Sequence, residues 1–280
     1  MTSEAGARGT SRAMTWVPLV TVWIVWGTTY LGSSVIGDTM PPLLGNGSRL
    51  FVAAGLLALG MRMFAGRASV RVTRSQLRSL AMLGVMTLGV SVGVTTLAVR
   101  VLPSGIAALL VSVNSLFIVL LRAACGDRPA RLTWIGVGVG LTGLALMLLP
   151  GGTALRSGTE SDALVWSLAL LAGTFSWSYF SFRSAGFGLP SNPLTITLYE
   201  MAAAGAALIV AGIVVGEHWE FATVSTRSWT AWGWLVAVSL IGYLSFITVL
   251  GRAPVSLVMT YGYVNPVIAV LLGWLLNAEH

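Results

Sequence analysis

Long apolar runs separated by short polar segments dominate the hydrophobic pattern of the chain. Because each residue of a helix rises about 1.5 Å, roughly 20 apolar residues are needed to cross a hydrocarbon core about 30 Å thick. Nine segments meet this requirement, and none shows the alternation of a barrel strand. A helix satisfies its own backbone polar groups in lipid. We therefore predict membrane-spanning helices over residues 14–36, 42–63, 79–99, 104–124, 132–150, 163–183, 192–215, 229–250 and 254–277. The first is predicted to be a retained span rather than a cleaved signal peptide, because it is long and eight more follow.

Composition supports a protein of the lipid bilayer. Hydrophobic residues make up 56% of the chain and charged residues only 9%, whereas soluble domains carry about 25% charged residues. The net charge of +7 does not indicate a nucleic-acid partner, because the basic residues cluster between the apolar runs. All 16 basic residues are arginine, and the absence of lysine excludes a Walker A loop and hence an ATP-driven pump.

Metal and redox chemistry are also not expected. Cys125 is the single cysteine, and His218 and His280 are the two histidines. These residues cannot form an internal disulfide or a standard structural zinc site. We predict that the protein has no metal and no cofactor.

The arginines predict the orientation of the helices, because arginine is enriched in the cytoplasmic loops of membrane proteins. With the N-terminus in the cytoplasm, the cytoplasmic segments hold Arg8, Arg12, Arg62, Arg67, Arg71, Arg74, Arg78, Arg122, Arg128, Arg131, Arg183 and Arg252. The outer loops hold only Arg100, Arg156 and Arg227. The pattern predicts a multi-pass protein of a bacterial-type plasma (inner) membrane, with the C-terminus of this chain outside.

An internal repeat appears when the sequence is shifted against itself by 151 positions. This one shift pairs Trp26 with Trp177, Pro42 with Pro193, Arg49 with Glu200, Pro103 with Pro254, and Asn114 with Asn265. Around the last pair the two segments read VNSLFIVLL and VNPVIAVLL. The alternative is chance similarity among apolar helices. We interpret the pattern as a duplicated unit of five helices, with the first copy over residues 14–150 and the second over 163–280.

Five is an odd number of helices, so the second copy enters the membrane from the opposite side, as in the inverted repeats of secondary transporters. The partner of the helix at 132–150 would lie beyond residue 280. We therefore expect an all-α integral membrane fold with a 5+5 pattern, nine helices and the tenth absent. Truncation is the favoured explanation, and a protein that works with nine helices is the alternative.

Glu200 and Arg49 are the sharpest candidates for a functional site. Glu200 lies within a predicted span, where an ionised carboxylate costs about 2.5–3.5 kcal/mol on insertion scales. Its repeat-related residue is Arg49, and at about 4 Å with an effective dielectric near 20 their attraction would be roughly 4 kcal/mol. The hypothesis is that the two bind the charged ends of a zwitterionic solute or form an ion pair that opens and closes with transport. In the alternative, both side chains snorkel to the membrane interface.

Further candidates are polar or aromatic side chains at equivalent places in the two halves. Asn114 and Asn265 lie deep in their predicted helices, where they either coordinate a solute or form a helix-to-helix hydrogen bond. The aromatic candidates are Tyr261, Tyr263, Trp26, Trp177 and Tyr30. Their hydroxyl and indole groups suit an amphipathic solute, and the alternative is that the aromatic residues anchor the helices at the interface.

Glycines at four-residue spacing predict close helix packing rather than a site. Gly89 and Gly93 lie in one predicted helix, and Gly136 and Gly140 lie in another. Small residues with this spacing let helices approach one another.

Several segments together resemble the EamA family of drug/metabolite transporters. They are WGTTYLGSSVI, SRLFVAAGLL, PSGIAALLVSVNSLF, WIGVGVGLTGLALML, YEMAAAG and SLVMTYGYVNPVIAVLLGWLLNAE, and the resemblance covers essentially the whole chain. It implies ten helices in two inverted domains, and export of amino acids, metabolites or drugs driven by ion gradients or exchange. The chain departs from the family pattern in lacking the tenth helix and in carrying Asp127 where the family often has glutamate.

The function expected from these observations is that of a secondary transporter that exports a small metabolite, amino acid or drug across the inner membrane by alternating access, and there are two alternatives. An inactive truncated or accessory membrane protein is one alternative. A membrane-embedded enzyme is the less favoured one, because the spans hold no paired catalytic carboxylates, no nucleophile near a histidine and no metal-ligand cluster. The expected partners are a small-molecule solute and the lipid bilayer. Coupling to a proton or a counter-solute, and assembly into a homodimer, are further partners that the sequence leaves open.

Overall fold

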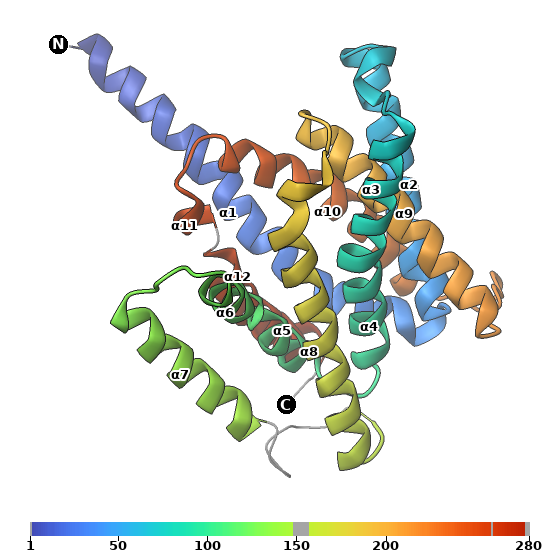
Figure 1. The fold of residues 1–280 in the computed structure, drawn as a ribbon. Coiled ribbons are helices and arrows are strands. Elements are labelled where there is room, and N and C mark those ends of the chain that lie inside the picture. Colours follow the sequence, from blue (N-terminus) through green and yellow to red (C-terminus); the bar gives the residue numbers. More distant parts are fainter. Residues whose placement is uncertain (1, 148–156, 259, 278–280) are drawn as a thin grey trace.

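The computed structural model describes residues 2–147, 157–258 and 260–277, and this part of the chain is helical throughout (Figure 1). The α-helices are α1 (Thr2–Thr39), α2 (Pro42–Phe64), α3 (Arg74–Gly84), α4 (Val90–Ala98), α5 (Ser104–Ser112), α6 (Asn114–Ala124), α7 (Arg131–Met147), α8 (Glu160–Arg183), α9 (Pro193–Val214), α10 (Thr226–Leu250), α11 (Val255–Val258) and α12 (Tyr261–Asn277). The other elements are two 3-10 helices, η1 (Arg67–Val70) and η3 (Ser184–Phe187), and a π-helix, η2 (Val85–Gly89). The all-helical prediction is confirmed for the described residues.

Seven helical segments of the described chain are long and apolar enough to cross a membrane. They are Thr15–Thr39, Pro42–Phe64, Arg74–Ala98, Ser104–Ala124, Glu160–Phe187, Pro193–Val214 and Thr226–Leu250. Each corresponds to a predicted span. The segment Tyr261–Leu276 is apolar but shorter, and the predicted span at 132–150 ends outside the described residues, so the predicted count of nine stays a prediction.

Local sequence explains where several helices begin. Pro42 and Pro193 occupy the first turns of α2 and α9, where a missing backbone N–H costs nothing. Thr73 and Gln76 form a capping box at the start of α3, with each side chain bonded to the other residue's backbone N–H.

Two spans are internally irregular. The π-helix η2 lies between α3 and α4, and Val113 separates α5 from α6.

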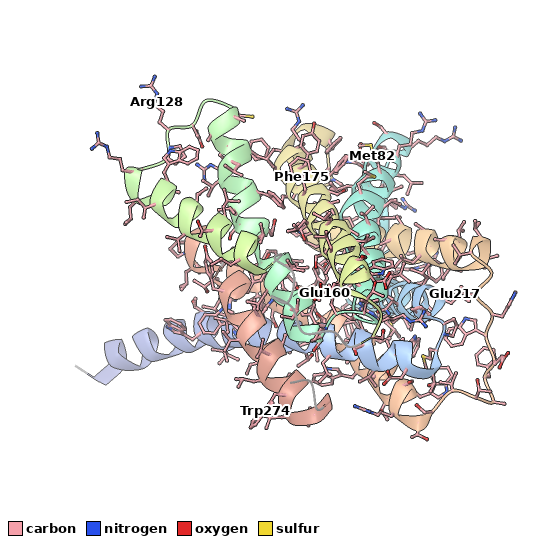
Figure 2. All side chains as sticks on the ribbon, turned by 90° about the horizontal axis from the view of Figure 1, so that it is seen from below. Met82, Arg128, Glu160, Phe175, Glu217 and Trp274 are labelled. Atoms are coloured by element: carbon pink, nitrogen blue, oxygen red, sulfur yellow. The ribbon has the colours of Figure 1, made fainter. Side chains whose placement is uncertain are left out.

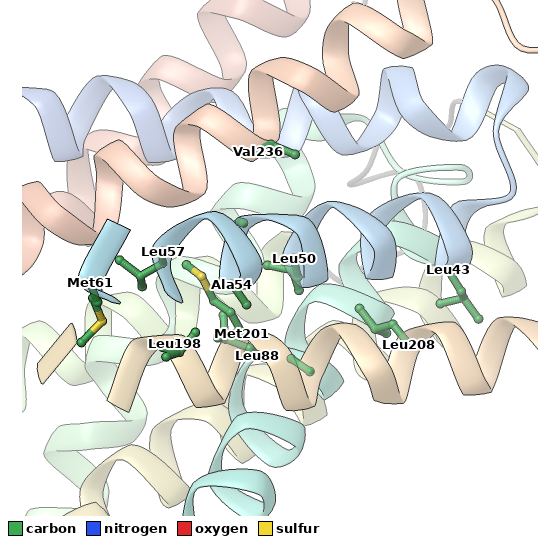
Figure 3. Close-up of a cluster of buried hydrophobic side chains, with 12 residues drawn as sticks. Leu43, Leu50, Ala54, Leu57, Met61, Leu88, Leu198, Met201, Leu208 and Val236 are labelled. Atoms are coloured by element: carbon green, nitrogen blue, oxygen red, sulfur yellow. The ribbon is translucent and has the colours of Figure 1, made fainter. Parts of the chain in front are cut away.

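The largest hydrophobic cluster lies between α2 and α9, which run side by side (Figure 3). Its members include Leu50 of α2 and Met201 of α9, both almost fully buried. The backbones of the two helices nearly touch at Gly47 and Gly205: a Cβ added at Gly205 would lie 2.7 Å from the backbone nitrogen of Phe51. Only glycine permits this approach, so Gly47 and Gly205 fix how α2 packs against α9.

α3 also packs against α9 and α10 packs against α2, and the remaining helices pair with one another. α1 packs against α10 and α12, α8 packs against α4 and α6, and α5 packs against α12. α7 stands to one side of the bundle in Figure 1, and its Ile135 and Val139 are 62% and 68% exposed. Exposed apolar side chains of this kind are what a lipid environment requires.

The prediction that glycines mediate close helix packing is right for Gly93 and wrong for Gly136. A Cβ at Gly93 would meet the Leu208 side chain at 2.8 Å, and one at Gly89 would meet Ala204 at 3.6 Å. A Cβ at Gly136 would meet nothing within 4 Å in the described part of the chain. Gly136 therefore does not mediate close packing, and a Cβ at Gly140 would make only ordinary contact with Leu116 of α6, at 3.8 Å.

Candidate functional site

Arg49 lies at the meeting of α2 and α10 and is only 4% exposed. Its Nε donates to Oδ1 of Asn46 at 2.8 Å, and its Nη1 donates to the hydroxyl of Ser239 at 3.1 Å. The same Asn46 oxygen accepts from the Ser33 hydroxyl of α1 at 3.2 Å. Neutral groups of three helices thus hold the guanidinium in place, and Arg49 does not snorkel to the surface.

Glu200 lies in the first half of α9 and is half-buried. It forms no hydrogen bond and no ion pair within 4.0 Å among the described residues. Neither Glu200 oxygen is a fully enclosed side-chain oxygen without a hydrogen bond, whereas Thr96 Oγ1 is such an atom in the described chain.

The backbone around Glu200 is fixed by an unusually close helix contact. A Cβ added at Gly84 of α3 would lie 2.5 Å from the carbonyl oxygen of Glu200 and 2.6 Å from its Cα. The π-helix η2 begins at the next residue, and its Met86 carbonyl accepts a hydrogen bond from the Ser176 hydroxyl of α8 at 2.5 Å. π-Helical turns occur frequently at functional sites. Here the turn lies beside the Glu200 backbone.

Arg49 and Glu200 are not paired directly, and Tyr243 of α10 lies within electrostatic range of both. Tyr243 follows Ser239 by four residues, so the two side chains lie on one face of α10. The Tyr243 hydroxyl forms no hydrogen bond within the described chain. Tyr243 and Ser239 were not among the residues predicted from the sequence, and their four-residue spacing within an apolar helix was the signal that could have indicated them.

An aromatic cluster surrounds Trp26 of α1 and includes Tyr243. The ring of Trp26 lies 5.3 Å from Tyr243, 5.2 Å from Phe246 and 5.0 Å from Tyr261, centroid to centroid. Tyr30 lies within electrostatic range of Tyr261. The structure therefore brings together Trp26, Tyr30 and Tyr261 of the predicted residues.

The other two aromatic candidates lie elsewhere. Tyr263 is 66% exposed and does not join the cluster. Trp177 packs against the hydrophobic cluster between α2 and α9.

The two candidate asparagines each bond to a neighbouring helix. Asn114 Oδ1 accepts from the Ser178 hydroxyl of α8 at 2.6 Å. With its amide nitrogen facing backbone carbonyls, Asn265 donates to Trp23 of α1 at 2.9 Å and to Tyr261 at 3.1 Å. Both arrangements correspond to the helix-to-helix alternative, and Asn265 is 6% exposed.

The described residues contain no group of three or more histidine, cysteine, aspartate or glutamate side chains able to hold a metal ion. Arg128 lies at the outer edge of the helices in Figure 2, far from Glu217. The polar groups that do converge, from α2, α9 and α10, lie within an apolar bundle. Polar and charged groups inside an apolar bundle are typical of polytopic α-helical membrane proteins that move ions or solutes.

Comparison with known proteins identifies the family. The model of the EamA-like transporter family matches residues 14–149 and 164–280. The chain belongs to this family. It is 33% identical over 264 residues to the uncharacterized inner membrane transporter YedA of Escherichia coli strain K12, across 93% of this chain and 82% of the relative. The YedA proteins of Escherichia coli O6:H1 and O157:H7 match to the same extent.

A solved crystal structure also resembles the chain. The two superpose with a TM-score of 0.64 and 22% sequence identity, over 93% of this chain and 87% of the other. At this identity the likeness concerns the fold alone. The family match and the relative that is 33% identical confirm the resemblance to the EamA family seen in the sequence.

Proposed function

We propose that the protein is a secondary transporter that exports a small metabolite, amino acid or drug across the inner membrane by alternating access. The observation that carries the proposal is Glu200, a carboxylate of an apolar helix that has neither a hydrogen bond nor an ion pair in the described chain. Burying such a group without a partner costs about 2.5–3.5 kcal/mol. A solute or a coupling proton that binds there would offset this cost.

The inverted repeat is part of the proposal, and the packing of the helices supports it. The 151-residue shift maps α1 onto α8 and α2 onto α9. The contact of α1 with α10 then corresponds to that of α8 with α4, and the contact of α1 with α12 corresponds to that of α8 with α6. The Asn114 bond to α8 likewise corresponds to the Asn265 bond to α1.

Within the site, Arg49 and Glu200 have different roles. Neutral groups hold the Arg49 guanidinium, which supplies a fixed positive charge. Glu200 supplies a negative charge that is free to bind, and Tyr243 lies within range of both. The proposed cycle alternates between Glu200 bound to a solute or proton and Glu200 exposed to the opposite side of the membrane.

Replacing Glu200 with glutamine tests the role of the carboxylate. Glutamine keeps the size of the side chain but carries no negative charge and no titratable proton. We expect Glu200→Gln to abolish proton-coupled export, by at least about a hundredfold, while exchange of solute across the membrane persists. Efflux from vesicles with and without a pH gradient, across a panel of amino acids and amphipathic drugs, measures both activities.

Glu160 offers a matched control, because it is an exposed glutamate in the first turn of α8. Glu160→Gln should transport like the parent protein. Unchanged proton coupling in Glu200→Gln would exclude Glu200 as the proton carrier, and the absence of any solute flux in the parent would contradict the transporter proposal.

Tyr243→Phe tests the residue that lies within electrostatic range of both charges. The substitution removes only the hydroxyl and keeps the ring against Trp26. We expect the KM of transport to rise about fivefold, as for the loss of a hydrogen bond of about 1 kcal/mol, with a smaller change in kcat. An unchanged KM would place the hydroxyl outside the solute site.

A further inference from the structure

The helices α2 and α9 run antiparallel, and at each end hydrogen bonds join one helix to the loop that follows the other. The start of α2 meets the loop that follows α9, and the loop that follows α2 meets the start of α9. These two helices carry Arg49 and Glu200. Both helices that carry the proposed site are therefore held to each other at each end.

At one end, Glu217 holds the beginning of α2. Its Oε1 accepts from the backbone N–H of Leu43 at 3.1 Å, and its Oε2 accepts from that of Leu44 at 2.8 Å. The N-cap residue Pro41 offers no side-chain cap, so the carboxylate is supplied from another helix's loop. A carboxylate at a helix N-terminus also interacts favourably with the helix dipole. Figure 2 shows Glu217 close to this end of α2.

The fit at this end depends on a glycine. A Cβ added at Gly212, near the end of α9, would lie 3.0 Å from Oε2 of Glu217 and 2.9 Å from the Leu44 side chain. We call the two bonds from Leu43 and Leu44 to Glu217 the Glu217 latch.

At the opposite end, uncharged groups make the connection. The Tyr199 hydroxyl donates to the carbonyl of Val70 at 2.7 Å, and the Thr195 hydroxyl donates to the carbonyl of Ser69 at 2.7 Å. Tyr199 directly precedes Glu200. We call these two bonds the Tyr199 latch.

We propose that Glu217 and Tyr199 are positioning residues that close opposite ends of the α2–α9 pair, so that each controls access to Glu200 from one side of the membrane only. The inference rests on the proposed transport function, because it assigns the two sides of an alternating-access cycle. Both latches are closed in this structure. Breaking one lets the two helices separate at that end, while the other end stays held.

The chemistry of the two latches differs. The Glu217 latch contains charge-assisted bonds, which are roughly twice as strong as neutral ones. The Tyr199 latch contains only neutral bonds. The end held by Tyr199 and Thr195 should therefore open more readily than the end held by Glu217.

The test uses the reporter Glu200→Cys in a Cys125→Ser background, which leaves one cysteine in the protein. A membrane-impermeant thiol reagent is applied to right-side-out and to inside-out vesicles. Adding Glu217→Gln should speed labelling about tenfold from the side on which Glu217 lies, the change that about 1.4 kcal/mol produces in an equilibrium. Adding Tyr199→Phe should speed labelling about fivefold from the other side only, which corresponds to about 1 kcal/mol.

Two matched controls separate latch opening from general loosening. Glu220→Gln changes an exposed glutamate of the Glu217 loop, and Tyr179→Phe changes a tyrosine that is 40% exposed. Neither should change labelling from either side. Hydrogen exchange of the segment containing Leu43 and Leu44 gives a second readout, since their amides should exchange about tenfold faster in Glu217→Gln.

Equal acceleration from both sides, or unchanged labelling in both variants, would overturn the inference. Labelling requires no solute, so its outcome is independent of transport. One-sided labelling in a protein that moves no solute would contradict the proposed function and leave the latches standing.

Discussion

Arg49→Met is expected to reduce transport by at least about a hundredfold while leaving the protein folded. Methionine fills a similar volume, and replacing a buried charge with an apolar side chain of similar size is often neutral or stabilising. Transport would nevertheless fail, because the site would lose the fixed positive charge held between Asn46 and Ser239. Solute efflux and the midpoint of thermal unfolding in detergent measure the two effects separately.

Arg49→Lys is the informative companion variant. Lysine keeps the charge but offers a point ammonium in place of the planar guanidinium that reaches both Asn46 and Ser239. We expect transport between that of the parent protein and that of Arg49→Met. If Arg49→Met transported normally, Arg49 would have a structural role at most. If it failed to fold, the polar network itself would be the dominant contribution of Arg49.

Gly84→Ala is the second substitution with a large expected effect. The added Cβ would lie within 2.6 Å of the Cα and carbonyl oxygen of Glu200, and backbone cannot yield as a side chain can. α3 and α9 must therefore separate, which displaces Glu200. We expect a loss of about 2–3 kcal/mol in stability, in the range of overpacked sites, and a fall in transport of more than tenfold.

Gly60→Ala provides the control for this prediction, because a Cβ at Gly60 of α2 meets nothing within 4 Å in the described structure. That substitution should leave stability unchanged or slightly raised, since alanine is the better helix former. Thermal unfolding in detergent and efflux would be compared across the two variants. Equal behaviour of Gly84→Ala and Gly60→Ala would contradict the close helix contact.

Much of the fold could be predicted because lipid makes the sequence signal strong. The span expected at 42–63 is Pro42–Phe64, and the one expected at 192–215 is Pro193–Val214. Both begin at a proline, which fixes the first turn. By contrast, α1 extends to Thr2, well before the predicted start. The polar residues before its apolar run carry no hydropathy signal, so the prediction began too late.

The site was predictable only in part. A repeat pairs residues along the sequence, and it drew attention to Arg49 and Glu200, two charged residues that the structure places within helices long enough to cross a membrane. It says nothing about which neutral groups will face them. Asn46, Ser239 and Tyr243 come from the packing of α2 against α10, which depends on contacts distant in the sequence. The prediction that Tyr263 shares the site with Tyr261 also found no support, because the two side chains point to different surroundings.

The π-helical turn between α3 and α4 constrains how this chain can vary in length. A π-helical turn holds one residue more than an α-helical turn, so a relative one residue shorter within Val85–Gly89 can continue as regular α-helix through this segment. Gly93, which faces Leu208, would keep its neighbour, because the turn itself absorbs the extra residue. Relatives that share this helix contact can therefore differ from the chain by a gap of a single residue at this turn while the rest of the helix aligns without one.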